Sequence, residues 1–449
     1  MSMKKIVRRR KQLEFEKNAF VVEAIAKELK PEWVQETLRE CGRESLRERL
    51  LPASFIVWFV ILLGLFRRIS YANLLWKLKD SWWTRQHWPD DPPTTTAVTK
   101  ARDRLGVEPM KKLYERCARE WTASSSGLVF HNRRVFAFDG STYKTPDSLE
   151  NDRGFGRPGA SRGRTAYPQM RAVTLTDVGT RIRLAERHGP YRSSEISLAR
   201  QLLPDIPLGS LVLLDRGFRA YDFLWDLQRG GSDFLLRVPD NIKPRLIQRL
   251  GSGDAIVEVD IPRHYRKERP DMPKSWILRM ISYLPEGSSA TIRLFTTIQD
   301  PQVPKEELAM LYHERWEEET ATDEFKTHLC GCATVNRAVV FRSQKPERIE
   351  QEWYGLLIAH NAVHKTMASA ASVVTSSPRR LSFTAALERL REATYEMMRL
   401  LTNFLRDRYQ RLLKSIARAT IPHRRDRKNP RCVKIKMSKY LLKKSKYAA

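Results

Sequence analysis

The sequence predicts an α/β protein, in which a mixed β-sheet covered by helices carries a β-rich insertion and is flanked by an all-α N-terminal region and a helical, basic C-terminal region. Three observations favour this fold class. Short apolar runs alternate with helical patterns between residues 134 and 240, whereas residues 15–124 have almost only helical patterns. Three further apolar runs, joined by Gly, Pro and charged turns, follow between residues 240 and 304. A chain of 449 residues can hold two or three such domains.

The charge of the chain is unusual in its sign. Lys and Arg number 81 against 52 acidic residues, which gives a formal net charge of +29 and a pI near 10.1. A charge of this size repels itself and indicates a polyanionic partner, for which nucleic acid is a better candidate than a membrane surface. Residues 424–446 hold eleven Lys or Arg residues and a single acidic one, Asp426, as segments that wrap nucleic acid often do.

One long apolar run, residues 53–66, is bracketed by Arg49 and Arg67. It is shorter than the roughly 20 residues that a membrane-spanning helix needs, so we expect a fully buried helix. The basic residues 1–11 have no apolar stretch behind them, so no signal peptide is expected.

The five cysteines are scattered along the chain and odd in number, which fits a reducing, intracellular setting. His328, Cys330 and Cys332 form a loose H-x-C-x-C cluster. No second pair with zinc-finger spacing accompanies them, so we expect no zinc site there.

Residues 1–128 are expected to form a helical, DNA-binding N-terminal domain. Pro31, Pro52 and residues 88–96 interrupt its helices, and the last of these segments ends in a cap for a helix over residues 97–105. Its basic surface is expected to include Arg102, Arg104, Lys111 and Lys112. DNA binding by helix insertion and a purely structural bundle are both compatible with this pattern.

Residues 129–240 are expected to form the first part of the sheet, in the order β-β-β-α-β-α-β. The predicted strands are 135–141, 167–177, 181–189, 211–218 and 233–238, and the predicted helices are 194–203 and 221–228. Asp139 is expected to end the first strand, with Gly140 turning the chain away, and Asp215 to end the fourth. Because neighbouring parallel strands end side by side, we expect the two carboxylates to meet, although a strand-end Asp is more often a turn former.

The remaining chain is expected to hold three segments. Residues 241–303 form the β-rich insertion, with strands at 255–261, 276–283 and 291–298. Residues 304–370 return to the core with helices over 305–329 and 346–367, and residues 371–449 form the C-terminal region, with a helix over 383–416 before the basic tail.

One face of the predicted helix 305–329 carries four polar side chains. At about 100° per residue they fall within an arc of about 60°, and they are Tyr312, Arg315, Glu319 and Lys326. A face of this kind can bind a phosphate and a metal ion together, although most charged helix faces are solvated surface.

If this helix faces the two strand-end aspartates, three carboxylates converge without His or Cys. Hard oxygen ligands of this kind select Mg²⁺ or Mn²⁺. Two such ions can activate a water or a 3′-hydroxyl on one side of a phosphodiester and stabilise the leaving oxygen on the other. On helix geometry alone, Asp323 competes with Glu319 for the third position.

These motifs together resemble the DDE transposases of the bacterial insertion-element-four family. The resemblance lies in FDGS around Asp139, LLDRGF around Asp215, and the Y-x2-R-x3-E-x6-K spacing that begins at Tyr312. It extends over nearly the whole chain through LLPASFIVWFVILLGLFRR, TPDSLENDRGFG, SQKPERIEQEWYGLLIAHN and NPRCVKIKMSKY. It implies a ribonuclease-H-like catalytic core in which Asp139, Asp215 and Glu319 are the catalytic ligands of two Mg²⁺ or Mn²⁺ ions, and it selects Glu319 over Asp323.

The resemblance also implies an activity. Members of the family cut DNA at the terminal inverted repeats of an insertion sequence, often through a hairpinned end, and join the freed 3′-hydroxyl to a target. For this chain it implies a cut-and-paste transposase that acts on double-stranded DNA as a homodimer in the bacterial cytoplasm, associated with the nucleoid. A non-catalytic DNA-binding protein and a general ribonuclease-H-like nuclease remain as alternatives.

The remaining signature residues carry over as contacts with DNA. Tyr312, Arg315 and Lys326 are implied to bind phosphate and terminal DNA. Trp316, which follows Arg315, and Trp276, in the insertion, are candidates to stack on a flipped base. Packing in the core or against the sheet is the alternative for each tryptophan.

Overall fold

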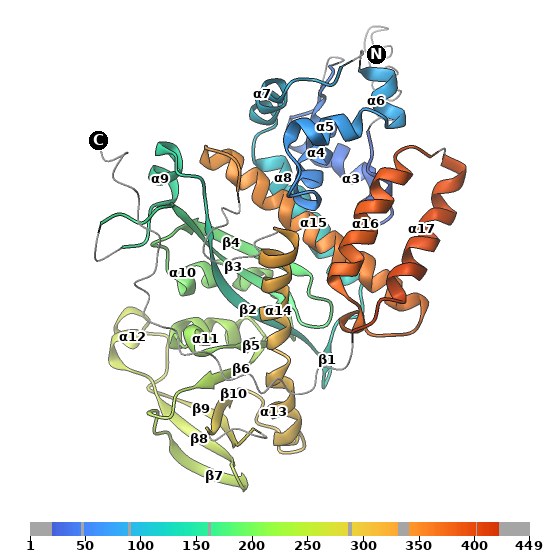
Figure 1. Ribbon diagram of the computed structural model, residues 1–449. Helices are drawn as coiled ribbons and strands as arrows, with labels where there is room; N and C mark the ends of the chain where they lie inside the picture. The colour runs from blue at the N-terminus through green and yellow to red at the C-terminus, as the bar shows by residue number, and fades with distance from the viewer. Residues whose placement is uncertain are drawn as a thin grey trace, which may run out of the picture. The chain divides into compact units, whose positions relative to one another are not determined.

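The computed structural model describes residues 20–45, 49–88, 91–159, 163–285, 290–330, 341–400 and 402–421 (Figure 1). These residues form two compact units rather than five successive segments. The helical unit contains the described residues up to Ser125, then 144–154 and 323–421, and the sheet unit contains 126–143 and 155–322. Cys332 and the basic tail over residues 424–446, including the NPRCVKIKMSKY motif, lie outside the described residues.

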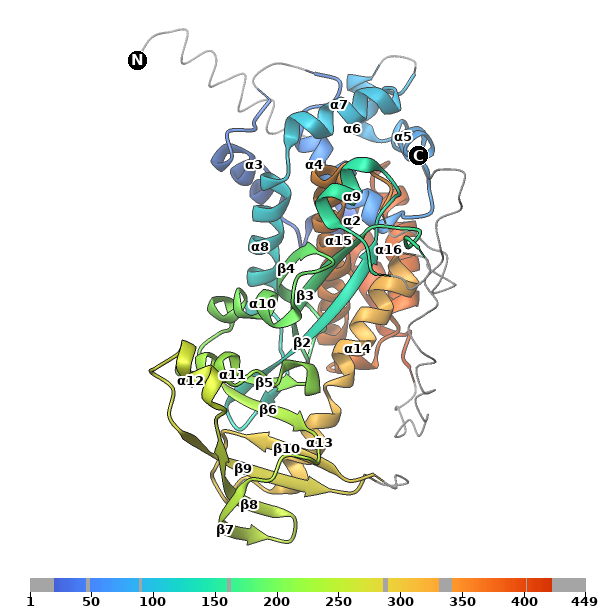
Figure 2. The ribbon, with the colours of Figure 1, turned by 90° about the vertical axis from the view of Figure 1, so that its left-hand side faces the viewer.

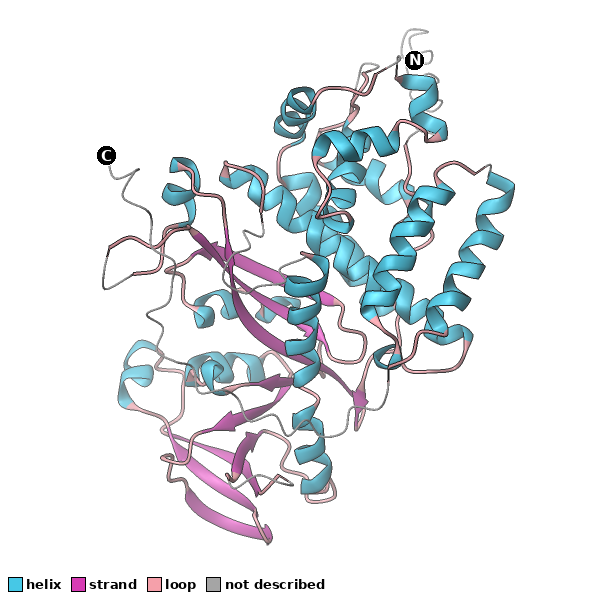
Figure 3. Ribbon diagram, viewed as in Figure 1, coloured by secondary structure: helices cyan, strands magenta, loops and turns pink. Residues whose placement is uncertain are grey.

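The helical unit contains no strand among its described residues (Figure 3). Its N-terminal helices are α2 (Glu23–Ala26), α3 (Pro31–Glu40), α4 (Ala53–Leu65), α5 (Tyr71–Leu78), α6 (Trp82–His87), α7 (Thr95–Leu105) and α8 (Glu108–Ala123). Its later helices are α9 (Leu149–Phe155), η3 (Glu324–Leu329), α15 (Pro346–Val373), η4 (Pro378–Arg380), α16 (Phe383–Met397) and α17 (Thr402–Ala417). The predicted helix over 383–416 is therefore two helices.

Helix α4 is the expected buried helix. All of its residues from Ser54 to Leu65 are buried, and none of the helices in the described part of the chain has the length and apolarity needed to span a bilayer. It crosses α15 at two glycines, where a Cβ on Gly64 would lie 2.8 Å from the Gly355 carbonyl oxygen and one on Gly355 would lie 2.7 Å from Val60. Glycine is needed at both positions because the two backbones approach so closely.

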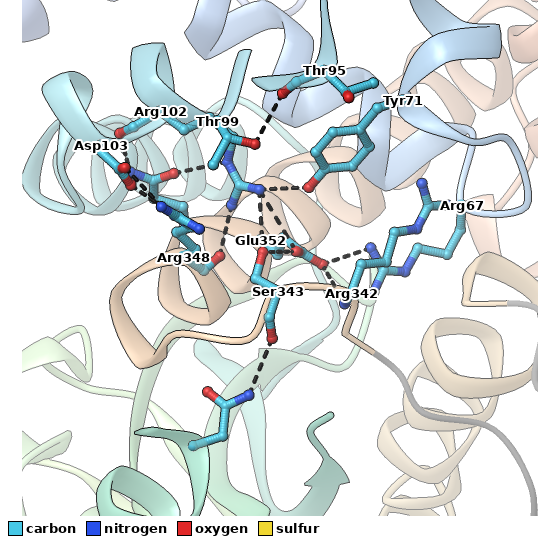
Figure 4. Close-up of polar contacts among 12 residues, drawn as sticks. Arg67, Tyr71, Thr95, Thr99, Arg102, Asp103, Arg342, Ser343, Arg348 and Glu352 are labelled. Atoms are coloured by element: carbon cyan, nitrogen blue, oxygen red, sulfur yellow. Dashed lines mark hydrogen bonds and ion pairs between the residues drawn. The ribbon is translucent and has the colours of Figure 1, made fainter. Parts of the chain in front are cut away.

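A buried polar cluster links α15 to the N-terminal helices (Figure 4). The Glu352 carboxylate lies 2.8 Å from Arg67 and 3.8 Å from Arg102, accepts a bond of 3.1 Å from the Arg342 backbone N–H, and bonds Ser343. Burial alone would raise the pKa of Glu352, but Arg67 and Arg102 outweigh it and lower that pKa. The cluster is thus a charge-balanced structural site.

Arg102 does not belong to a basic surface, so that prediction is wrong for this residue. Its guanidinium is fully buried and donates to the Tyr71 hydroxyl at 2.5 Å, to Gln351 at 3.0 Å and to the Arg348 carbonyl at 2.7 Å. Some of these partners lie about 250 residues from Arg102 along the chain. A local sequence pattern therefore cannot reveal the burial of Arg102.

The sheet unit contains one mixed sheet, as predicted. Its strands are β1 (Val129–Phe130), β2 (Arg133–Lys144), β3 (Gln169–Asp177), β4 (Arg183–Pro190), β5 (Leu211–Leu214), β6 (Asp233–Val238), β7 (Arg245–Gly251), β8 (Asp254–Asp260), β9 (Ser275–Tyr283) and β10 (Ile292–Thr296). The order is β4-β3-β2-β5-β6-β10-β9-β8-β7, with β1 paired to β2. Strands β2, β5 and β6 are parallel to one another. From β6 onward, each neighbouring pair is antiparallel, in the order β6, β10, β9, β8, β7.

One detail of the predicted sheet is corrected. Strand β2 continues to Lys144, so Asp139 lies in its middle and Gly140 does not turn the chain away. A Cβ at Gly140 would lie 2.5 Å from Glu195, so this glycine makes room for a neighbouring side chain. The strands of the segment 241–303, predicted as a β-rich insertion, extend the core sheet from β6.

Helices cover both faces of the parallel part of the sheet (Figure 2). On one face, α10 (Glu195–Arg200) and α11 (Tyr221–Arg229) contribute Leu198 and Phe223 to an apolar core. On the other, α13 (Lys305–His313) contributes Leu308 to a second core. The remaining short helices of the sheet unit are η1 (Leu203–Asp205), η2 (Arg216–Phe218) and α12 (Arg263–Glu268).

The predicted helix 305–329 is divided into three parts. Helix α13 ends at His313, α14 runs over Trp316–Asp323, and η3, a π-helical turn, follows over Glu324–Leu329. At the first break the Arg315 N–H bonds the Tyr312 carbonyl and the Glu317 N–H bonds the Glu314 carbonyl, which is the tighter 3₁₀ pattern. The sequence contains neither Gly nor Pro here, so packing on the sheet imposes the break.

Candidate active site

The two strand aspartates lie on neighbouring parallel strands. Strands β2 and β5 pair in register up to Ala137 and Leu213, and Asp139 and Asp215 each lie two residues further along. Adjacent strands are about 4.8 Å apart, so the structure places the two carboxylates side by side. Asp215 also accepts the Gly217 N–H at 2.7 Å, a short side-chain turn that ends β5 and begins η2.

The helix signature lies over the end of β5. The Tyr312 hydroxyl donates to the Leu214 carbonyl at 3.4 Å, next to Asp215, and the Arg315 guanidinium forms an ion pair of 2.7 Å with Glu319. Burial raises the pKa of Tyr312, Arg315 lowers it, and Asp215 raises it further, which shows that Asp215 is an electrostatic neighbour of this helix. Tyr312 and Arg315 thus lie near Asp215, and Arg315 in turn pairs with Glu319.

Three residues beside Asp139 were not predicted as site residues. The Thr322 hydroxyl lies 3.2 Å from Asp139 and 3.2 Å from Glu318, and it accepts a bond of 3.1 Å from Arg183. Both Glu318 and Arg183 are fully buried. On an ideal helix, Glu318 lies away from the face that carries Tyr312, Arg315 and Glu319. In the structure, α14 is oriented so that Glu318 points toward β2. The sequence pattern carried no signal for Arg183, whose strand was expected only as an element of the sheet.

The Glu318 carboxyl lies against the Asp139 carboxyl. Burial raises the pKa of Glu318 well above its ordinary value, repulsion by Asp139 raises it further, and Arg183 opposes the rise. The raised pKa favours the neutral form of Glu318, because burial and the neighbouring Asp139 both disfavour a second negative charge there. Glu318, Arg183 and Thr322 therefore form the immediate polar surroundings of Asp139.

The three remaining residues predicted to contact DNA differ in exposure and in the unit to which they belong. Trp316 is 45% exposed on α14, which leaves it open to a ligand. Trp276 is 5% exposed and packs edge-on against Trp225 and Phe234, so the structure contradicts its prediction as a DNA contact and assigns it to the core. Lys326 lies on η3, which belongs to the helical unit.

A hollow of about 520 Å³ opens beside this edge of the sheet. It reaches Gly217, two residues beyond Asp215, and Glu195, which packs on Gly140. Its lining residues are Arg171, Tyr191, Arg192, Ser193, Ser194, Glu195, Ile196 and Gly217. Arg192 is exposed at this hollow, and Arg216 and Arg219 are exposed just after Asp215. Positive side chains therefore lie close to the acidic edge.

Two family models match this chain. The model described as insertion element 4 transposase N-terminal matches residues 20–115, and the model described as transposase DDE domain matches residues 130–362. The second match contains Asp139, Asp215 and Glu319.

Relatives with the same kind of name occur in Escherichia coli strain K12. The chain is 28% identical over 423 residues to the transposase InsG for insertion sequence element IS4, and the match covers 92% of each chain. It is 29% identical over 296 residues to the putative transposase InsZ, covering 60% of this chain and 92% of the relative. A piggyBac transposase synaptic complex with hairpin DNA, solved by cryo-EM, matches with 12% identity and a TM-score of 0.41 over 87% of this chain and 84% of that one, a similarity too weak to support an argument.

Proposed function

This chain belongs to the transposases with a DDE domain, and from that premise we propose that it cuts DNA at the terminal inverted repeats of its insertion sequence and joins the freed 3′-hydroxyl ends to target DNA by cut-and-paste. The observation that carries the proposal is the meeting of Asp139 and Asp215 on adjacent strands beneath the helix of Glu319. The order β4-β3-β2-β5-β6, with β2, β5 and β6 parallel, supports a ribonuclease-H-like core for this part of the sheet.

The enzyme depends on a divalent metal ion, as its family does, and we propose Asp139, Asp215 and Glu319 as its ligands, two Mg²⁺ or Mn²⁺ ions being held. The fit rests on donor chemistry, since all three side chains offer carboxylate oxygens, which hard cations prefer. The Glu318 carboxyl lies against Asp139, so a further oxygen-bearing side chain adjoins this set of ligands. When bound, two such ions activate the attacking water or 3′-hydroxyl and neutralise the leaving oxygen.

The chain's own side chains position the acids and the DNA. The ion pair with Arg315 orients Glu319, and the bond from Tyr312 to the Leu214 carbonyl holds the helix on β5. We propose Arg315 as a phosphate contact, since a guanidinium matches the geometry of phosphate oxygens. We propose Lys326 as a further phosphate contact and Trp316 as the stacking partner of a flipped base.

Double-stranded DNA is the proposed partner in two roles, as terminal repeat and as target. The net charge of +29 and the exposed Arg192, Arg216 and Arg219 near the acidic edge support this assignment. Because two ends must be cut for one element to move, we propose that a homodimer holds both ends in a synaptic complex.

A nicking assay tests the proposal. The substrate is supercoiled DNA that carries the inverted repeats found outside the reading frame of the element. Wild type should nick at the repeat ends only when Mg²⁺ or Mn²⁺ is present, while Asp139→Ala, Asp215→Ala and Glu319→Ala should bind the repeats without cutting them. Asp323→Asn, an exposed acid on the same helix, is the matched control and should cut normally.

Other outcomes would contradict parts of the proposal. Equal cutting of DNA without the repeats would indicate a general nuclease, and repeat binding without any cutting would indicate a DNA-binding protein. Glu318→Gln tests the third ligand, because loss of cutting in this variant and normal cutting in Glu319→Gln would move that role to Glu318.

A further inference from the structure

Three potential metal ligands lie together in the helical unit, apart from the carboxylates of the sheet unit. They are Glu324, His360 and His364, and one ligand atom from each lies within 4.8 Å of the other two. All three side chains are buried, at 7%, 0% and 1% exposure. A carboxylate and two imidazoles therefore converge at a place from which bulk water is excluded.

The secondary structure brings the three side chains together. His360 and His364 are four residues apart on α15, so their rings lie on one face of the helix, with ring centroids 4.5 Å apart. Glu324 is the first residue of the π-helical turn η3. π-Helical turns are rare and occur frequently at functional sites, and here the turn begins with the residue that faces the two histidines.

The surroundings of the three ligands are aromatic. The His360 ring lies 5.6 Å from Phe325, and the His364 ring stacks on Phe383 at 5.1 Å. Polar and charged groups are costly in such surroundings unless they are paired. Glu324 lies 3.3 Å from His364 Nε2. A cation placed among the three would engage the carboxylate and both imidazoles at once.

We propose that Glu324, His360 and His364 bind one divalent transition-metal ion, for which Zn²⁺ is the best fit. Two imidazole nitrogens and one carboxylate oxygen form a zinc donor set, whereas the all-carboxylate set of the sheet unit suits hard ions. Zinc ligands at about 2.0–2.1 Å from the metal lie roughly 3.3 Å from one another in tetrahedral geometry. Glu324 and His364 already have this separation, and small side-chain movements bring in His360.

The ion would join η3 to α15 within the helical unit. Lys326 lies on the same turn as Glu324, so the bound ion would hold the last signature residue in one orientation. The inference does not depend on the proposed function, because it concerns a site whose ligands take no part in the acidic edge of the sheet unit.

Metal analysis of the full-length protein tests the inference. Protein purified from zinc-supplemented cells and dialysed against Mg²⁺ should retain about one equivalent of zinc. Glu324→Gln and His364→Gln should lose it. His328→Ala is the matched control, since His328 is an exposed histidine on the same turn, and Asp139→Asn is the control for the sheet unit. Both controls should retain zinc.

Cobalt substitution and melting give readouts that do not depend on activity. Co²⁺ should produce visible d–d absorption in wild type and in His328→Ala but not in Glu324→Gln, and a chelator should lower the Tm of wild type but not that of Glu324→Gln. If His364→Gln fails to fold, the isosteric Glu324→Gln decides. The inference would be overturned if the wild type bound no zinc and gained no stability from it, or if folded Glu324→Gln retained the metal. Neither result would contradict the proposed DNA cleavage, which the nicking assay tests separately.

Discussion

Two buried glutamates, one in each unit, have opposite surroundings. Glu352 in the helical unit lies between Arg67 and Arg102, and these cations lower its pKa despite its burial. Glu318 in the sheet unit lies against Asp139, and burial and this carboxyl together raise its pKa. Similar burial thus accompanies a lowered pKa between two cations in one unit, and a raised pKa beside a second carboxyl in the other, where Arg183 offsets the rise only in part.

The difference distinguishes an acid that stabilises the fold from the acids that we propose as metal ligands. A carboxylate between two cations is satisfied within the protein. A buried carboxyl whose pKa is raised beside a second carboxyl is a perturbed group of the kind that functional sites concentrate. The comparison therefore supports the sheet edge, and not the cluster around Glu352, as the place where the chemistry occurs.

The largest effect is expected from Asp139→Asn and Asp215→Asn. Loss of a metal ligand removes several kcal/mol of transition-state stabilisation, so DNA nicking should fall by about a thousandfold or more, while the folded state persists. Single-turnover nicking with circular dichroism as a fold check measures this effect. Glu352→Gln should nick at a rate close to wild type per folded molecule, and an equal loss in all three variants would remove the distinction between the units.

Stability should respond in the opposite way. Glu352→Gln breaks a buried ion pair and leaves Arg67 and Arg102 poorly compensated, so the free energy of unfolding should decrease by about 3–5 kcal/mol. Denaturant titration of the metal-free protein measures the change. Glu347→Gln, an exposed acid in the first turn of the same helix, should remain within about 0.5 kcal/mol of wild type. Similar losses in both variants would show that the balanced cluster does not stabilise the unit.

Acidification should weaken the Glu352 cluster. The pKa of Glu352 is lower in the folded chain than its ordinary value of 4.5, so the unfolded chain binds more protons between the two pKa values. The stabilisation by Glu352 is therefore complete above about pH 4.5 and is lost as the pH falls through the folded pKa. Unfolding measured between pH 7 and pH 3 should show a smaller decrease for Glu352→Gln than for wild type, and parallel curves would contradict this assignment.

The smallest effect on folding is expected from Trp316→Ala. Trp316 is exposed, so the free energy of unfolding should stay within about 0.5 kcal/mol of wild type, but the ratio of nicked to fully processed DNA ends should change if the ring stacks on a flipped base. Product analysis on sequencing gels measures that ratio. Trp76→Ala alters an equally exposed tryptophan of the helical unit and should leave the ratio unchanged, and an unchanged ratio in Trp316→Ala would exclude the stacking role.

Much of the sheet could be predicted from the sequence, because its signals are local. Short apolar runs marked the strands, and the parallel pairing of β2 with β5, the strands that carry or precede Asp139 and Asp215, followed from the helix-linked order. Strand β7 was missed because all but one of its residues are exposed and its apolar residues, Leu246, Ile247 and Leu250, do not alternate with polar ones.

The rest depended on tertiary contacts. Nothing local indicated the breaks in the helix between Lys305 and Leu329, which turn Glu318 toward Asp139. The burial of Arg102 depends on partners in α15, and the burial of Trp276 depends on Trp225 and Phe234. The position of a residue on a helical wheel or in a strand pattern does not predict these tertiary contacts, because they form only when segments distant in the sequence pack together.

The pairing of β6 with β10 also constrains how the gene can change. Because β10 covers the open edge of β6, the segment 241–303 is joined to the core by main-chain hydrogen bonds. A deletion of that segment would expose β6 as a new edge strand that can pair with other chains. A shortened protein that lacks this segment would therefore need another strand or helix to cover the edge of β6.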